Sequence, residues 1–137
     1  MVVTEETISK HLAKLLTPLT KSEHNIESTN DFIEKLKGLK IDNGYKMVSL
    51  DFVSLFTSVP LDYTIKVILD EVYKEKRIQT KLTRTELKTL LEMCTKEMHF
   101  SFNGKIYKQK NGVAMGSPLG PVIANIFMVH LEKQMIP

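Results

Sequence analysis

Hydrophobic residues recur every three or four positions in five segments of the chain, the spacing that places them on one face of an α-helix. The pattern predicts helices around residues 8–16, 32–39, 61–72, 87–98 and 122–131. Pro18 stops the first helix, and Gly38 lies near the end of the second. Thr83 and Glu86 have the spacing of a capping box in front of the fourth helix.

Two other segments alternate between hydrophobic and polar residues, as strands do. In residues 46–52, KMVSLDF, the apolar side chains at alternate positions share one face, and we expect that face to lie on the core. In residues 100–109, FSFNGKIYKQ, the pair Asn103-Gly104 separates two alternating runs and predicts a hairpin. Together the elements predict an α/β (α+β) fold with a small antiparallel sheet packed on helices.

The 137-residue chain is long enough for one domain with its own core. Its hydrophobic fraction of 42% and charged fraction of 26% are ordinary for a globular protein, so disorder is not expected. Cys94 is the only cysteine, which favours a reducing compartment, and its helical spacing favours a core position over a reactive thiol. The N-terminus, MVVTEETISK, lacks the apolar segment of a signal peptide, so we expect an intracellular protein. The formal net charge of +3 is weak evidence for a nucleic-acid partner.

Residues 112–127, GVAMGSPLGPVIANIF, run from a glycine- and proline-rich loop into an apolar segment. Because no charged residue occurs from Asn111 to Leu131, a membrane span has to be considered. A span requires about 20 mostly apolar residues, and the glycines, prolines and polar residues interrupt the first half of this segment. Pro118 suits the first turn of a helix. We therefore expect a buried helix behind a tight loop, and no membrane span.

Asp51 lies at the end of an apolar alternation, in the stretch SLDFVSLFTSVPL of residues 49–61. A carboxylate at the end of a buried strand is costly unless something compensates its charge. A divalent cation would do so, since Mg²⁺ accepts a few protein oxygens together with substrate phosphates. An aspartate on an exposed sheet face would need no such partner. The motif alone leaves both interpretations open.

Together these two stretches resemble the reverse transcriptases. Asp51, followed by Phe56 and then by SVPL, is similar to the first catalytic block of that family. GVAMGSPLGPVIANIF is similar to the second block, the loop and helix that carry the template and the incoming nucleotide. The combination of LFTSVP with YKQKNGVAMGSPLGPVIANIF most resembles the Penelope-like retroelement branch. The resemblance covers most of the chain from Asp51 onward, and both blocks in order are more specific than either alone.

The resemblance implies a site in which the first block holds two Mg²⁺ ions and the nucleotide. Asp51 would be the catalytic carboxylate and would ligate both metal ions, while the backbone carbonyl of Phe52 would complete the shell of one. The amides of Ser54 and Leu55 would face the triphosphate. Phe56 would exclude a ribose 2′-hydroxyl and so favour deoxynucleotides, with a plain core aromatic as the less favoured alternative.

The second block would complete this site through its loop. Met115 and Gly116 would contact the nucleotide, with Gly116 letting the backbone approach the base pair closely. Gly112, Ser117 and Pro118 would form the template and primer loop.

The chain departs from the family pattern at several positions. Met115 replaces the usual glutamine, and Gly120 stands where a serine is more usual. The side-chain hydrogen bonds of the family are therefore not expected at this site, where the loop would contact the nucleotide through its shape and its backbone. The family's third block, Tyr-x-Asp-Asp, should follow residues 122–131, but the sequence contains no Asp-Asp pair. Because a single carboxylate holds a pair of Mg²⁺ ions poorly, we expect that this chain alone does not polymerise DNA.

We therefore expect one partial reverse transcriptase domain, in which residues 1–44 are a remnant of the fingers and a helical lead-in, and residues 45–137 are an incomplete palm with the first two blocks. The complete enzyme would act on an RNA template, a DNA primer and deoxynucleoside triphosphates. A palm remnant that binds nucleic acid or protein without catalysis remains an alternative. An unrelated α/β domain would leave the order of the two blocks unexplained. An incomplete palm would also leave the 46–52 edge unpaired, which favours self-association.

Overall fold

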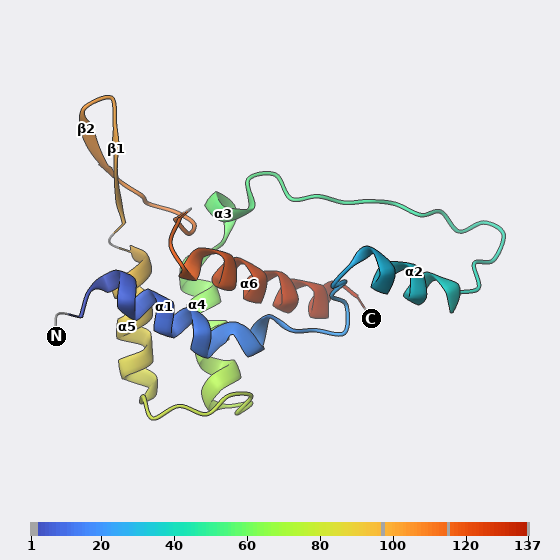
Figure 1. Ribbon diagram of the computed structural model, residues 1–137, viewed down its shortest axis with the longest axis horizontal. Helices are drawn as coiled ribbons and strands as arrows, with labels where there is room; N and C mark the ends of the chain where they lie inside the picture. The colour runs from blue at the N-terminus through green and yellow to red at the C-terminus, as the bar shows by residue number, and fades with distance from the viewer. Residues whose placement is uncertain (1–2, 97, 115, 137) are drawn as a thin grey trace.

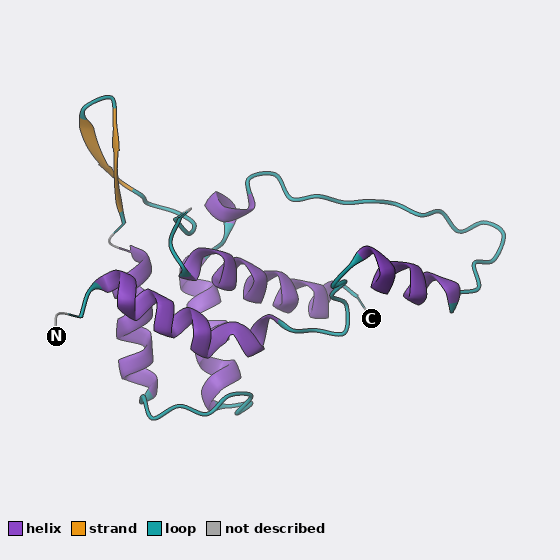
Figure 2. Cartoon of the chain, in the orientation of Figure 1, coloured by secondary structure: helices purple, strands orange, loops and turns teal. Residues whose placement is uncertain are grey.

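The computed structural model describes residues 3–96, 98–114 and 116–136. Within these ranges the chain forms mainly helices and one small sheet, as Figure 1 and Figure 2 show. In chain order the elements are α1 (Glu5–Leu16), η1 (Thr17–Thr20), α2 (Thr29–Lys37), α3 (Leu55–Ser58), α4 (Leu61–Tyr73), α5 (Arg84–Lys96), β1 (His99–Phe102), β2 (Lys105–Lys108) and α6 (Leu119–Met135). This mixture of helices with a small antiparallel sheet confirms the predicted fold class.

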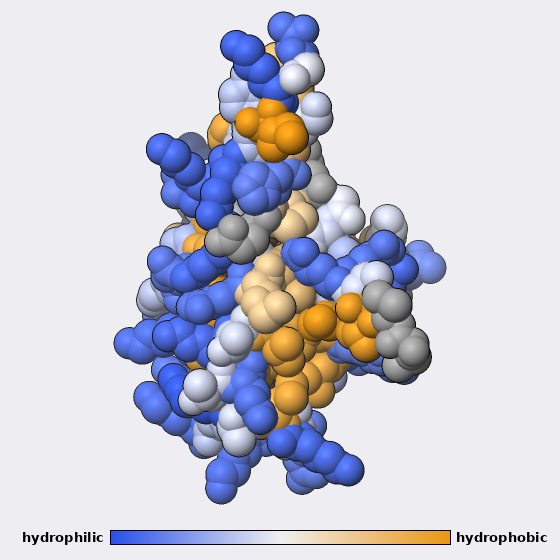
Figure 3. All heavy atoms as spheres, turned by 90° about the vertical axis from the view of Figure 1, so that its left-hand side faces the viewer, coloured by the Kyte–Doolittle hydropathy of each residue, from blue (hydrophilic) through white to orange (hydrophobic). Residues whose placement is uncertain are grey.

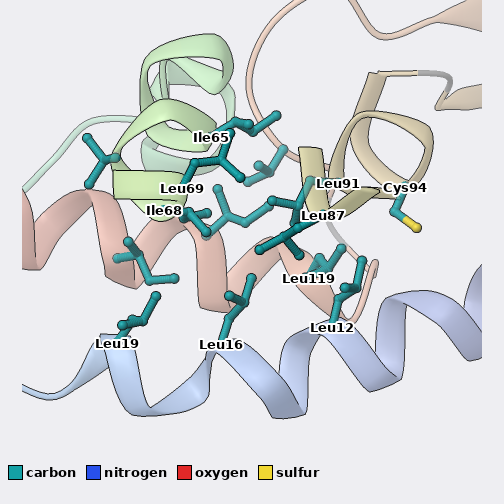
Figure 4. Packing of buried hydrophobic residues seen from close by; sticks show 14 of the residues in the cluster. Leu12, Leu16, Leu19, Ile65, Ile68, Leu69, Leu87, Leu91, Cys94 and Leu119 are labelled. Carbon is teal, nitrogen blue, oxygen red and sulfur yellow. The ribbon is translucent and has the colours of Figure 1, made fainter. Parts of the chain in front are cut away.

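The helices α1, α4, α5 and α6 form the body of the molecule and share one hydrophobic core (Figure 4). Leu16 of α1, Ile68 of α4, Leu87 of α5 and Leu119 of α6 are fully buried and point into it. Burial of each such side chain contributes about 1.5–3 kcal/mol. Cys94 on α5 belongs to the same core, as predicted, and its burial raises the pKa of the thiol. The thiol is therefore neutral near pH 7 and acts as a small apolar side chain.

Local hydrogen bonds fix where these helices begin. The Thr4 hydroxyl accepts a hydrogen bond from the Thr7 amide at 3.2 Å at the start of α1. Before α5, the Thr83 amide donates to Glu86 Oε2 at 2.8 Å, and the Glu86 amide donates to Thr83 Oγ1 at 3.3 Å. This reciprocal pair is the predicted capping box, and it satisfies two amides that the helix leaves without an internal partner.

The β1–β2 hairpin has the predicted position and turn. Phe100 lies opposite Tyr107 in the antiparallel register. Asn103 and Gly104 both have positive φ, 50° and 74°, which is the backbone of a type I′ turn and explains why these two residue types occur there. The side chains of both strands are exposed. The hairpin therefore projects from the end of the helical body, as Figure 1 shows.

The strand predicted for residues 46–52 is wrong. Residues 45–52 are extended but form no strand, and Val48 and Leu50 are 75% and 87% exposed. A strand is stable only beside another strand that accepts its backbone hydrogen bonds, and the only sheet in the described ranges is the distant hairpin. Helix α2 forms as predicted but buries no residue, so its apolar stripe also faces solvent. Together α2 and the loop after it form an arm that leads away from the helical body (Figure 1).

Helix α6 is the buried helix predicted behind the glycine-rich loop. It packs against α1, η1, α3 and α4, while the two-stranded hairpin is the only sheet in the described chain. Ile123 is fully buried, and Ile126 and Val129 are nearly so. No helix in the described part of the chain combines the length and apolar character that a bilayer span requires.

Candidate active site

Asp51 lies in the extended, exposed segment between α2 and α3. One of its carboxylate oxygens accepts a hydrogen bond from the following amide, with Phe52 N and Asp51 Oδ1 separated by 2.9 Å. The burial that would have made this carboxylate costly is absent, so water can solvate its charge. The exposed position leaves the Asp51 carboxylate accessible to a ligand.

The described residues do not make a complete metal site around Asp51. In residues 3–96, 98–114 and 116–136, no group of three or more His, Cys, Asp or Glu side chains could hold a metal ion. Mg²⁺ prefers six oxygens, whereas Asp51 and the Phe52 carbonyl would supply only a few of them. The donor set in this part of the chain therefore falls short of a two-metal site.

The carboxylates that follow the first block take part in structural ion pairs. The pairs are Asp62 Oδ1 with Lys96 Nζ at 2.6 Å, Asp70 Oδ1 with Arg84 Nη2 at 3.0 Å, and Glu71 Oε2 with Arg77 Nη1 at 2.8 Å. The hydrogen bond from Arg84 lowers the pKa of Asp70, and the hydrogen bond to Asp62 raises the pKa of Lys96. Two of the pairs, those of Asp62 and Asp70, join α4 to α5. These acids therefore stabilise the helical body, and their partners are basic side chains.

A left-handed residue turns the chain from Asp51 into the short helix α3. Ser54 has φ 53° and ψ 52°, a conformation that non-glycine residues rarely adopt. Its carbonyl accepts hydrogen bonds from the Ser58 amide at 3.1 Å and from the Thr57 hydroxyl at 3.0 Å. These bonds close one helical turn, in which Leu55 and Phe56 are half-buried against the core. The turn thus fixes the backbone that carries Phe56.

The loop of the second block is joined to this turn through the backbone of Phe56. The Val113 amide donates to the Phe56 carbonyl oxygen at 2.7 Å. Gly112 is buried and has φ 73°, and a Cβ atom at this position would lie 2.2 Å from the Phe56 oxygen and 2.5 Å from Thr57 Cα. Only glycine fits there, because a side chain would overlap backbone atoms that cannot move aside without opening the turn. The structure therefore brings the two blocks into direct contact.

Gly120 holds the other side of the same loop against α6. A Cβ atom on Gly120 would lie 2.7 Å from the Ala114 carbonyl oxygen and 3.6 Å from Phe56 Cε1. The first turn of α6 therefore approaches both the loop and the Phe56 ring. This close approach gives a physical reason for glycine at a position where the family more often has serine.

The other predicted loop residues are Ser117, Pro118, Gly116 and Met115. Ser117 lies two residues before α6, where its hydroxyl accepts from the Leu119 amide at 3.4 Å and its carbonyl accepts from the Gly120 amide at 3.1 Å. Pro118, which was predicted to lie in the first turn of the helix, immediately precedes the first helical residue, Leu119. Gly116 has φ 89°, and a Cβ there would meet no atom within 4 Å, so this side of the loop is open. Met115, which was predicted to contact the nucleotide, lies outside the described residues.

The structure thus brings together only part of the predicted site. Phe56 and Gly112 meet directly, whereas in the described ranges Asp51 is not part of a group of three or more His, Cys, Asp or Glu side chains that could hold a metal. Sequence reasoning missed the roles of Val113 and Ala114, whose backbone atoms link the loop to Phe56 and to Gly120. Their signal was indirect, since small residues cluster in GVAMGSPLG where backbone segments must approach closely.

Comparison with known proteins identifies a family whose model covers nearly the whole chain. The family model described as reverse transcriptase (RNA-dependent DNA polymerase) matches residues 2–137. Searches of curated proteins and of solved structures found no match. Because the family model covers nearly the whole chain, and because the two blocks meet at Phe56, the chain belongs to the reverse transcriptase family.

Proposed function

We propose that this chain supplies the first two catalytic blocks of a retroelement RNA-directed DNA polymerase of the Penelope-like branch. The observation that carries the proposal is the contact of Phe56 with the Gly112–Val113 backbone, which joins the blocks in the order that the family requires. In this proposal residues 45–137 are the palm part, and residues 1–44 are a remnant of the fingers and a helical lead-in.

The proposed roles follow the position of each residue around that contact. Asp51 is the catalytic carboxylate, and Phe52 offers its carbonyl oxygen beside it. Phe56 is half-buried, and its backbone contacts the loop of the second block. In this proposal its ring limits the room beside the sugar of a bound nucleotide. The Ser54 and Leu55 amides belong to the same turn and would face the triphosphate.

The second block would hold the strands being copied. Gly112 fixes the loop against Phe56, while Ser117 and Pro118 immediately precede the helix behind it. The open side at Gly116 leaves room for a base pair to approach the backbone. Met115 is assigned to the same nucleotide pocket on its sequence position alone. The template, primer and deoxynucleoside triphosphates are the partners that the family implies.

The isolated chain is proposed to be a fragment without polymerase activity. In the complete enzyme Mg²⁺ would polarise the reacting oxygens of the nucleotide and the primer. The described residues place no group of three or more possible ligands together, and the acids of α4 are paired with basic side chains. Further carboxylates, such as those of a Tyr-x-Asp-Asp block, would have to complete the metal site.

Primer extension tests this proposal directly. The purified 137-residue chain is incubated with a primed RNA template, labelled deoxynucleotides and either Mg²⁺ or Mn²⁺. We expect no template-dependent incorporation above that of an Asp51→Ala variant. Incorporation that Asp51→Ala abolishes would contradict the proposed inactivity of the fragment.

A longer protein that adds a Tyr-x-Asp-Asp block tests the proposed role of Asp51. We expect such a protein to extend the primer, and we expect Asp51→Ala to abolish extension. Full activity of the Asp51→Ala variant would contradict the assignment of the catalytic carboxylate.

A further inference from the structure

Two glycines hold the loop of the second block and leave no spare room on either side of it. At Gly112 a Cβ atom would lie 2.2 Å from the Phe56 carbonyl oxygen. At Gly120, in the first turn of α6, a Cβ atom would lie 2.7 Å from the Ala114 carbonyl oxygen. Both neighbours are backbone atoms, so neither gives way as the end of a flexible side chain does. The two glycines therefore determine how close the loop lies to α3 and to α6.

Gly120 is also the point at which α6 approaches the ring of Phe56. A Cβ atom on Gly120 would lie 3.6 Å from Phe56 Cε1, which is ordinary van der Waals contact. The ring is half-buried and packs against the hydrophobic core, so its inner side is already occupied. A side chain larger than a methyl group at residue 120 would therefore press on the Phe56 ring and on the Ala114 carbonyl from the same side.

The outer side of the loop is open. A cleft of about 690 Å³ borders the loop there, and its lining includes Thr57, Val113 and Ala114. A Cβ atom on Gly116 would meet no atom within 4 Å. Figure 3 looks at the end of the molecule where the hairpin rises from the helical body, and hydrophobic side chains reach the surface below the hairpin. Loop atoms that are pushed from α6 therefore have room to move outward.

Substitution of Gly120 by serine, the more usual residue in the family, requires such a movement. The Ala114 oxygen has to move from 2.7 Å to about 3.4 Å from the new Cβ atom, a change of about 0.7 Å. The same oxygen accepts a hydrogen bond from the Ser117 amide at 3.4 Å, so it cannot turn aside without losing that bond. The backbone of the loop therefore moves as a whole. In enzymes a misplacement of about 1 Å can change a rate by about 100-fold.

We propose that Gly120 is a positioning residue that determines sugar specificity. Because Gly120 has no side chain, the Ala114 carbonyl and the Phe56 ring lie close to α6 and leave more room beside the ring than a serine would allow. The chain therefore discriminates less strictly between deoxyribose and ribose than its Gly120→Ser variant. This inference rests on the proposed function, in which Phe56 limits the room beside the sugar of a bound nucleotide.

NMR measures the displacement in the 137-residue chain without any enzymatic activity. Labelled phenylalanine rings give signals from six residues, and the signal that is lost in Phe56→Leu identifies Phe56. We expect Gly120→Ala and Gly120→Ser to shift the Phe56 ring signal, with the larger shift for serine because its side chain is larger. The signals of Phe32 on α2 and Phe102 on the hairpin should stay in place, since both rings are exposed and neither contacts Gly120.

Asn125→Ser is the matched control for this measurement. It places the same side chain at an exposed position of the same helix, and it should leave the Phe56 signal unchanged. An unmoved Phe56 signal in Gly120→Ser, or an equal shift in Asn125→Ser, would overturn the proposal. Failure of both Gly120 variants to fold, beside a folded control, would also overturn it, because Gly120 would then serve only the packing of the helical body.

Sugar specificity is measured in a longer protein that adds the third block. The readout is the ratio of kcat/KM for a deoxynucleotide to kcat/KM for the matching ribonucleotide. We expect Gly120→Ser to raise this ratio by about tenfold, the order expected for a displacement somewhat below 1 Å, and Asn125→Ser to leave it unchanged. In a Phe56→Leu background Gly120→Ser should change the ratio much less, because Gly120 acts through the ring. An unchanged ratio, or an equal change in both backgrounds, contradicts the proposed role.

The two measurements distinguish this inference from the proposed function. If the longer protein with wild-type Gly120 synthesises no DNA, the proposed function fails, and the NMR signal still decides whether Gly120 positions Phe56. If synthesis depends on Asp51 but Gly120→Ser changes neither the ring signal nor the sugar ratio, the inference fails alone.

Discussion

Gly112 lies where the backbones of the two sequence blocks are in direct contact. Its positive φ and the 2.2 Å separation between a would-be Cβ and the Phe56 oxygen exclude any other residue without movement of the backbone. Gly116 has an equally unusual φ of 89° but open space around it. The two glycines therefore separate the cost of backbone conformation from the cost of steric overlap.

We predict that Gly112→Ala lowers the free energy of unfolding by about 2–3 kcal/mol, the sum of a left-handed alanine and the loss of the Val113–Phe56 hydrogen bond. Gly116→Ala should carry only the conformational cost of about 1–2 kcal/mol. Urea unfolding followed by circular dichroism gives both values. Equal losses in the two variants would show that the contact with Phe56 contributes nothing.

Asp51 marks the limit of what its own sequence environment could predict. The motif left a metal ligand and an exposed aspartate as alternatives, and the structure shows an exposed carboxylate that belongs to no three-ligand group among the residues it describes. A metal site depends on residues that are distant in sequence, and the spacing around one aspartate does not reveal them. The catalytic role proposed for Asp51 therefore comes from the resemblance to a family, and not from its local chemistry.

At the level of elements, the helices followed from the sequence because their determinants are local. The apolar stripes of α1, α4, α5 and α6 predicted which faces are buried, and the capping box and the Asn103-Gly104 turn predicted two boundaries. The 46–52 segment has an equally regular alternation but forms no strand, because strand formation depends on a partner elsewhere. Periodicity likewise predicted α2 but not its exposure, which depends on what packs against it.

The capping box before α5 leads to a prediction at this scale. Thr83→Ala should lower the free energy of unfolding by about 1 kcal/mol, since the Glu86 amide loses its acceptor. Thr85→Ala, an exposed position inside the same first turn, should leave stability unchanged or slightly raised, because alanine is the better helix former.

Thermal or urea unfolding of these variants, together with Thr83→Ala/Glu86→Ala, measures the box as a unit. Because each residue caps the other, the double variant should lose less than the sum of the two single variants. Strict additivity would mean that the two hydrogen bonds act independently.

At the scale of the whole molecule, the helical body is well packed while the arm is not. Between residues 45 and 53 the chain is extended, and Tyr45, Val48, Leu50 and Val53 are at least 75% exposed. Such a segment offers unpaired backbone groups together with apolar side chains, which is the combination that promotes strand pairing between molecules. The same body also carries the basic hairpin at its other end, so the two projections differ in chemistry.

We therefore predict that the isolated chain self-associates through residues 45–53, and that light scattering shows a mass that rises with protein concentration. Val48→Lys with Leu50→Lys should reduce this association, because charges on an unpaired strand oppose pairing with a second copy. Ile106→Lys, at a similarly exposed apolar position on the hairpin, is the matched control and should leave association unchanged. The variants should share one melting temperature at low concentration, since none of the three side chains is part of the core. A stable monomer at every concentration would mean that the exposed arm remains solvated, and that its apolar residues do not drive pairing between chains.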